Sequence, residues 1–211
     1  GATGGASWDY ATAWSFSPME SLTYIFPSFF GFGGQTYWGS MPFTDMPLYW
    51  GGAILLFAPW ALVLKRDRLT WFLVTLAAAA WVVSFGKFLP LLYSPLFHLL
   101  PYFNKFRVPS LIQVLVLLSV IVLAGRALQA LWEKIQAGGE PAADLARKFT
   151  LAGGIIAGFC LLLLVLQAAI KPMYMGWVSA ARSQLAGAGA DQAFGLFTAD
   201  LLRRLALTVG L

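Results

Sequence analysis

Long apolar segments alternate with short polar turns along most of the chain. Residues 47–64, 69–86, 108–128 and 149–170 each approach the roughly 20 residues that an α-helix needs to cross a bilayer. A further apolar stretch begins at residue 201. The pattern predicts an all-α fold, a polytopic transmembrane helical bundle of about four spans with a truncated fifth.

Residues 1–46 differ, because glycine, proline and aromatic residues replace the long apolar runs. Glycine and proline favour loops and turns, and amphipathic aromatic side chains favour the membrane–water interface. The run Ser17-Pro18-Met19-Glu20 has the order of an N-cap, a first helical residue and a first-turn acid, which predicts a short helix at 19–26. We expect an ordered, extracytoplasmic aromatic loop here, followed by a transmembrane helical region at 47–211.

The segment 84–110 interrupts the pattern between the second and third apolar runs. The ten residues between Pro90 and Pro101 are too few to span a bilayer. The polar residues of the segment include the only histidine of the chain and three cations: His98, Lys87, Lys105 and Arg107. We expect a short helix lying at the membrane surface, followed by a tight cationic turn that leads into the third span.

Composition supports a membrane protein. Apolar residues make up 59% of the chain and charged residues 11%, with a mean hydropathy of +0.73, whereas soluble domains are about a quarter charged. The net charge of +5 is small, so we expect membrane lipids rather than nucleic acid as partners. The single cysteine, Cys160, excludes an internal disulfide. Because no starting Met or signal peptide precedes Gly1, we expect a piece of a longer protein.

The orientation in the membrane does not follow from a simple count of cations, because seven Lys and Arg fall on each side of the predicted bundle. The absence of cations from residues 1–46 and the dense cationic turn 65–68 decide it. They place residues 1–46, 87–107 and 171–200 outside the cytoplasm. The cations at 87, 105 and 107 then oppose the positive-inside rule, which indicates another role for them.

Asn104, Lys105 and Arg107 directly precede Pro109, which suits the first turn of a helix. A helix N-terminus favours anions, and arginine adds a bidentate fork for phosphate. Together with Lys87, these residues predict a site for a lipid phosphate or pyrophosphate. The alternative is that they only bind bulk lipid phosphate at the mouth of the span.

The other polar candidates each have two interpretations. Asp9, Glu20 and Asp45 are either solvated loop charges, or a general base or metal ligand that faces the same surface as the cations. His98 is either a polar tip of the surface helix or a proton carrier or pigment ligand. Nucleotide-binding glycine loops are absent from the sequence, and one His with one Cys cannot form a conventional His/Cys metal site.

Short motifs in serial order over residues 9–128 resemble those of the YfhO-type bacterial membrane proteins. They are Asp9-Tyr10-Ala11-Thr12-Ala13-Trp14-Ser15 with Ser17-Pro18-Met19-Glu20, Phe26-Pro27-x-Phe29-Phe30-Gly31, Tyr37-Trp38-Gly39 with Pro42-Phe43-Thr44, Pro47-x-Tyr49-x-Gly51, Gly86-Lys87 and Pro101-x-x-Asn104-Lys105-Phe106-Arg107. That family is similar to the GT-C class of polytopic glycosyltransferases, which use polyprenyl-phosphate-linked sugars and work outside the cytoplasm. Beyond residue 128 the likeness is one of hydropathy alone.

The resemblance implies a glycosyltransferase-like protein of the bacterial inner (cytoplasmic) membrane that transfers a sugar to a cell-envelope acceptor. The aromatic loop 14–43 would bind sugar faces or lipid. The donor's lipid phosphate and its polar surroundings would be held by Lys87, Asn104, Lys105 and Arg107, with Glu20 and Asp9 as polar contacts. The class carries its catalytic acids near the N-terminus of the full chain, so no residue here is assigned as catalytic. We expect no cofactor in these residues, and any divalent metal in the part that precedes them.

Two other functions remain open. A non-catalytic membrane subunit or scaffold of a larger complex is the main alternative, because glycine- and alanine-rich helix faces and interfacial aromatics suit it equally well. A transporter or flippase is the third. It needs charges within its spans, and the interiors of these spans have almost none.

Overall fold

The structure is a computed structural model that describes residues 7–31, 33, 35–44, 48–105, 108–138, 140–185 and 187–209, with the backbone alone at 104, 140–142, 145–146 and 208–209. The described residues form helices joined by turns and contain no β-strand, which confirms the all-α prediction. They divide into two compact units, each described here by itself. Unit 1 comprises Gly1–Ser21, Gly39–Pro42 and Ala53–Ala127, and unit 2 comprises Leu22–Trp38, Phe43–Gly52 and Leu128–Leu211. The predicted loop 1–46 contributes to both units, and its separation from 47–211 as a domain stays a prediction.

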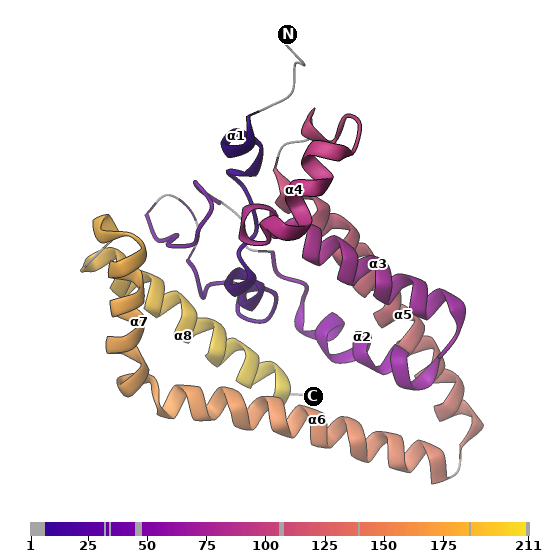
Figure 1. Ribbon diagram of the computed structural model, residues 1–211. Coiled ribbons are helices and arrows are strands. Elements are labelled where there is room, and N and C mark those ends of the chain that lie inside the picture. Colours follow the sequence, from indigo (N-terminus) through magenta and orange to yellow (C-terminus); the bar gives the residue numbers. More distant parts are fainter. Residues whose placement is uncertain are drawn as a thin grey trace. The chain divides into compact units, whose positions relative to one another are not determined.

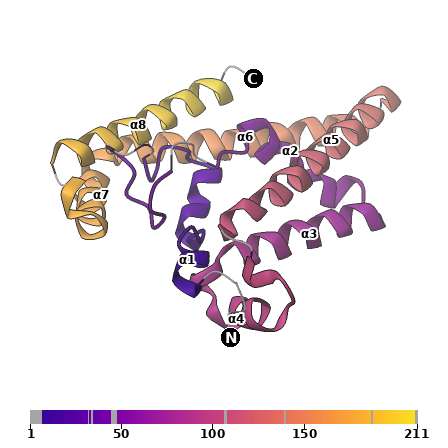
Figure 2. The same cartoon turned by 90° about the horizontal axis from the view of Figure 1, so that it is seen from above.

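Unit 1 consists of short helices and most of one long helix (Figure 1). Its α-helices are α1 (Trp8–Thr12), α2 (Gly52–Leu64), α3 (Arg68–Ser84), α4 (Pro90–Leu99) and the first part of α5 (Gln113–Ala137). The 3₁₀ helices between them are the first part of η1 (Pro18–Tyr24), η2 (Gly86–Phe88), η3 (Phe103–Lys105) and η4 (Pro109–Ile112). α3 and α5 run side by side in both Figure 1 and Figure 2, and η4 packs against α3.

A charged turn joins α2 to α3, as the sequence predicts. The Asp67 carboxylate caps α3 by accepting a hydrogen bond from the Thr70 backbone N–H at 2.9 Å. It also accepts one from the Arg126 guanidinium of α5. The bond from the Thr70 N–H, helped by Arg126, lowers the pKa of Asp67. One carboxylate thus satisfies a free donor of a helix end and ties the turn to α5.

Among the described residues, two helices are long and apolar enough to cross a membrane: Pro109–Ala137, which joins η4 to α5, and Arg147–Val165. The other two predicted spans form α2 and α3, of 13 and 17 residues. These reach about 20 and 26 Å at 1.5 Å per residue, less than the roughly 30 Å hydrocarbon core of a bilayer. The structure therefore does not confirm four spans. The predicted start of the first, at residue 47, lies outside the described residues.

The two candidate spans are largely exposed. Only 33% of the apolar window in Pro109–Ala137 is buried, and only 6% of that in Arg147–Val165. The core helix of a soluble protein would bury such residues. Large apolar side chains instead project outward, among them Ile121, Ile155 and Phe159. This exposure favours a membrane as the surroundings of both helices.

The helices extend beyond the predicted apolar runs. α5 continues to Ala137, so residues 129–137 are helical rather than a polar loop, because polar residues on an exposed face do not end a helix. Gly138, with a φ of +67°, follows α5 in the left-handed conformation that ends many helices. α6 (Glu140–Val165) begins shortly after Gly138.

The predicted fourth span, residues 149–170, is not one continuous helix. The chain bends at Leu166, and α7 (Gln167–Ala181) follows with Pro172 inside it. Pro172 lies in the second turn, where it removes one backbone hydrogen bond but does not end the helix. Neither glycine nor proline marks the bend at Leu166, so the sequence carries no local signal for it.

The last helix begins earlier than predicted. η5 (Ser183–Leu185) leads to α8 (Ala188–Val209), which starts well before Leu201 and packs against α6 and α7. The residues that α8 buries recur at helical spacing: Ala190, Ala193, Phe194, Phe197 and Leu201. Alanine is the strongest helix former, so this spacing outweighs the glycines of 186–190.

Aromatic side chains of the predicted loop form much of the core of unit 2. Phe29 and Trp38 pack against Tyr174 of α7, with ring centroids 5.7 and 5.5 Å away. The Trp38 indole N–H donates to the Tyr174 hydroxyl at 2.9 Å, and that hydroxyl donates to the Phe29 carbonyl at 2.6 Å. Phe26, Phe30, Tyr37 and Trp38 are buried. These rings hold unit 2 together, and the binding of sugar faces or lipid by the loop 14–43 stays a prediction.

Candidate functional site

The candidate site is built where α3 gives way to α4. Ser84 ends α3 with its side chain fully buried, and Gly86 follows with a φ of +48°. A Cβ at Gly86 would lie 2.1 Å from the Ser15 hydroxyl oxygen, so only glycine fits. The Lys87 backbone N–H donates to the same oxygen at 3.0 Å. These contacts fix the backbone of Lys87 and the direction in which α4 departs.

Residues 11–16 bind both ends of the 84–110 segment. The Phe16 N–H donates to the Ser84 carbonyl at 2.9 Å, and the Val108 N–H donates to the Ala11 carbonyl at 3.3 Å. The Gln113 side chain donates to the Ser84 hydroxyl at 2.7 Å. This buried polar cluster joins α3, α5 and the N-terminal segment.

The start of η4 is already capped by protein. The Ser110 N–H donates to the Trp14 carbonyl at 3.2 Å, and the Leu111 N–H donates to the Val108 carbonyl at 2.9 Å. Pro109, at the first helical position as predicted, has no N–H. These groups of the helix N-terminus are thus not free for an anion. Any phosphate site at this place has to rely on cationic side chains.

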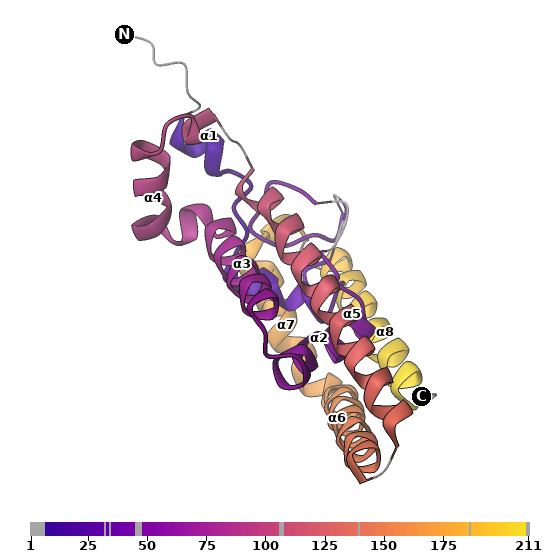
Figure 3. The same ribbon diagram turned by 90° about the vertical axis from the view of Figure 1, so that its right-hand side faces the viewer.

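α4 is the short helix that the sequence predicts, and one of its faces is packed against α1 (Figure 3). Tyr93 and Phe97 are buried together with Ala11. Trp8 meets both of their rings edge to face, at centroid distances of 5.9 and 5.3 Å. Burial raises the pKa of the Tyr93 hydroxyl. The small core between α1 and α4 therefore holds the helix in one orientation.

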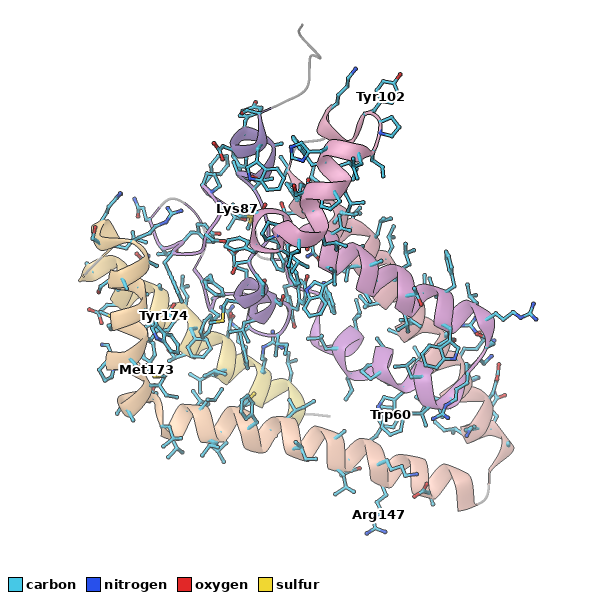
Figure 4. The ribbon with its side chains drawn as sticks, in the orientation of Figure 1. Trp60, Lys87, Tyr102, Arg147, Met173 and Tyr174 are labelled. Carbon is cyan, nitrogen blue, oxygen red and sulfur yellow. The ribbon has the colours of Figure 1, made fainter. Side chains whose placement is uncertain are left out.

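Lys87 and Lys105 lie in the short 3₁₀ helices η2 and η3, which precede and follow this helix along the chain. The Lys87 ammonium lies 5.5 Å from the centroid of the Phe88 ring, and the Lys105 ammonium 5.0 Å from that of Tyr102. Both lysines are exposed. Neither forms an ion pair with a described carboxylate, unlike Arg126, Lys148 and Lys171. Lys87 and Tyr102 lie well apart along α4 (Figure 4), so the structure does not bring the two predicted phosphate ligands together.

The other members of the predicted cationic set are only partly described. Asn104 belongs to η3, but the structure describes its backbone alone. Arg107 lies outside the described residues, as does Asp45. Lys105 with its ring contact is therefore the described part of the predicted cationic turn. Its exposed ammonium suits an anion at the protein surface, because an exposed ammonium over the face of an aromatic ring gains only about 0.5–1 kcal/mol from that ring.

The predicted acidic contacts separate into one exposed and one buried residue. Asp9 lies exposed on α1. Glu20 is 1% exposed, and its carboxylate accepts hydrogen bonds from the Ser17 N–H at 3.0 Å and the Ser40 hydroxyl at 2.7 Å. The Ser17–Glu20 bond confirms the predicted cap, now on a 3₁₀ helix. Glu20 is thus a buried carboxylate rather than a solvated loop charge, and its role as a polar contact of the donor stays a prediction.

His98 has structural partners. Its Nδ1 lies 2.9 Å from the Ser94 carbonyl one turn earlier, and its ring stacks on Trp8 at 6.1 Å with 13° between the planes. The side chain remains exposed at the edge of α4. This geometry fits the polar tip of a surface helix, the simpler of the two sequence interpretations.

Sequence reasoning missed the buried cluster of Ser15, Ser84 and Gln113. All three are at most 2% exposed. A signal existed, since Ser84 and Gln113 are the polar residues at the facing ends of two apolar runs. Among the described residues, no three His, Cys, Asp or Glu side chains lie close enough together to suggest a metal site.

The comparisons with known proteins add no assignment. The chain matches no protein-family model, no curated protein and no solved structure. The resemblance of residues 9–128 rests on their motifs alone, and the function has to be argued from the residues themselves.

Proposed function

We propose that the chain is part of a membrane glycosyltransferase-like protein of the GT-C type, which transfers a sugar from a polyprenyl-phosphate donor to a cell-envelope acceptor. The motifs that resemble the YfhO-type proteins motivate the reaction. One structural observation carries the site: the exposed Lys105 ammonium has no described carboxylate partner and lies a few residues before a candidate span.

In this proposal, Asn104, Lys105 and Arg107 hold the donor phosphate at the N-terminal end of the Pro109–Ala137 helix. Transfer of the sugar leaves negative charge on that phosphate, and fixed cations stabilise the charge as it develops. Lys87, at the other end of α4, meets the donor only if the lipid lies along the helix. The catalytic acid lies outside these residues.

We also propose that all four predicted spans cross the membrane. α2 and α3 act as spans in a bacterial inner membrane, with the bilayer thinned locally to match their length. Residues 1–46, 87–107 and 171–200 lie outside the cytoplasm, where polyprenyl-linked donors are used.

The test is sugar transfer from a labelled polyprenyl-phosphate donor by membranes that contain the full-length protein. Arg107→Ala and Lys105→Ala should each lower kcat/KM about 10- to 100-fold, because a hydrogen bond to a charged group is worth about 1.5–3 kcal/mol. The amount inserted in the membrane should not change. Lys134→Ala, at the exposed end of α5, is the control and should transfer normally. Normal transfer by Arg107→Ala would remove this site assignment.

A non-catalytic subunit or scaffold remains the second candidate, and a specific observation favours it. A Cβ built at Gly153, Gly154 or Gly158 of α6 meets nothing within 4 Å. Faces of small residues let membrane helices approach closely. Purification of the full-length protein with one partner in constant stoichiometry, combined with no transfer activity, would support this candidate over the enzyme.

A further inference from the structure

We infer that α4 is an interfacial anchor: its outer face lies among the acyl chains of one lipid leaflet, and Lys87 and Lys105 bind anionic headgroups at its two ends. The inference does not depend on glycosyl transfer. It concerns bulk membrane lipid and would hold equally for a scaffold.

The first support is that α4 is apolar on two opposite faces. Tyr93 and Phe97 form the inner face against α1. On the other side, Leu91 is 89% exposed, Leu99 79% and Leu92 41%. At 100° per residue these leucines lie roughly opposite Tyr93 and Phe97. A helix with two apolar faces is stable when both are covered, and described protein covers only one.

The second support is the attachment of α4 to a helix that is long and apolar enough to cross a membrane. It leaves from the end of α3 and returns to the start of Pro109–Ala137, a candidate span. η2 and η3 lie within these connections, and hydrogen bonds tie Lys87 and Val108 to residues 11–16. The helix therefore cannot move far from the end of that span, where the headgroup region of a leaflet begins.

The third support is charge. Residues 84–110 contain no Asp or Glu, and the described cations of the segment, Lys87 and Lys105, sit over the rings of Phe88 and Tyr102. Tyr102 is 70% exposed. An exposed apolar face flanked by lysines and aromatic rings is the composition of helices that lie in the interface and prefer anionic lipid. A second protein would have to bring its own carboxylates to match these lysines.

The depth of the outer face can be measured with spin labels on the full chain. In a Cys160→Ala background, Leu91→Cys or Leu99→Cys carries a nitroxide in vesicles of phosphatidylcholine and phosphatidylglycerol. Labels in the acyl region collide more with oxygen and less with a water-soluble nickel chelate. We expect an oxygen-to-nickel ratio several-fold above that of Arg68→Cys, the matched control in the charged α2–α3 turn.

Two outcomes would overturn the inference. Labels at 91 and 99 that are as open to nickel as the control would place the face in water. Labels shielded from both reagents would show that protein, a partner or a second copy, covers it.

A second experiment tests whether the lysines bind anionic lipid. In the Lys87→Gln, Lys105→Gln variant, the label at 99 should sit no deeper in mixed vesicles than in pure phosphatidylcholine, whereas the parent chain should sit deeper when phosphatidylglycerol is present. A parent chain whose label depth ignores phosphatidylglycerol would contradict the choice of anionic lipid. Inorganic phosphate added to the parent chain in pure phosphatidylcholine vesicles should not move the label deeper, since a leaflet rather than a free anion is the proposed partner.

Discussion

Gly86 and Ser15 approach so closely that no other residue type fits at position 86. A Cβ there would lie 2.1 Å from the Ser15 hydroxyl oxygen, and the backbone has a φ of +48°. This contact joins the end of α3 to a segment some 70 residues earlier, at the point from which α4 departs. Its consequences can be measured directly.

Gly86→Ala should destabilise the protein. The left-handed conformation alone costs a non-glycine residue about 1–2 kcal/mol, and the clash with Ser15 adds to it. Thermal unfolding in detergent should show a lower Tm. Gly125→Ala is the control, because a Cβ at Gly125 meets nothing within 4 Å; inside a helix it should stabilise by about 0.5–1 kcal/mol. A Gly86→Ala protein as stable as the parent would contradict the geometry.

Ser15→Gly should be coupled to the change at Gly86. Alone it should destabilise by about 1–3 kcal/mol, because the Lys87 N–H loses its acceptor. It also removes the atoms that a Cβ at 86 would meet. The double variant should therefore lose less free energy of unfolding than the two single variants added together, as neighbouring residues do in a double-mutant cycle. Strict additivity would show that the two sites do not touch.

Asp67→Asn should change stability in a pH-dependent way. The pKa of Asp67 is lowered in the folded protein, chiefly by the bond from the Thr70 N–H and further by Arg126. Its charge thus contributes stability above the ordinary aspartate pKa of about 3.9, and that contribution is lost as the pH falls through the folded-state pKa. Tm should be lower for the variant at neutral pH, and the two curves should converge in acid, where Asn resembles protonated Asp.

The matched control for this experiment is Asp144→Asn. Asp144 pairs with Lys148 one turn away on an exposed helix face, at 2.6 Å. Such exposed pairs contribute little, so Tm should hardly change at any pH. Parallel, non-converging curves for Asp67→Asn would mean that lost packing, not lost charge, causes the effect.

Tyr174→Phe should weaken unit 2 while keeping its shape. The hydroxyl is fully buried, accepts from the Trp38 indole and donates to the Phe29 carbonyl. Its removal leaves buried polar groups with fewer partners, at a cost of about 1–3 kcal/mol in the free energy of unfolding. Denaturant unfolding followed by tryptophan fluorescence measures the loss. Tyr102→Phe, on an exposed ring, should stay within about 0.5 kcal/mol of the parent.

The local part of the fold could be predicted from the sequence. Proline and capping signals placed the starts of η1 and η4, and the Pro90–Pro101 run gave α4, because these signals act within one helical turn. The charged turn before α3 was equally clear. The bend at Leu166 carries no local signal, and the full length of α8 depends on its packing against α6 and α7, so neither could be predicted in the same way.

The candidate site was less accessible to sequence reasoning. The cations of residues 84–110 were found, because their charge breaks a topological rule. Their separation along α4, and the capping of the η4 N-terminus by the Trp14 carbonyl, depend on the path of a segment about 95 residues earlier, a contact that no local pattern encodes. The burial of Glu20 and of the loop aromatics has the same origin, because a glycine- and proline-rich stretch can fold back into a core as readily as it can lie open.

The segment from Gly86 to Val108 is a loop whose two ends are both bonded to residues 11–15. Lys87 is fixed to Ser15 at its start, and Val108 to Ala11 at its end. The entropy of closing a loop grows only logarithmically with its length, and here the base is held by hydrogen bonds. Substitutions on the exposed face of α4 should therefore leave the packing of α3 against η4 intact, because hydrogen bonds hold the base of this loop independently of that face.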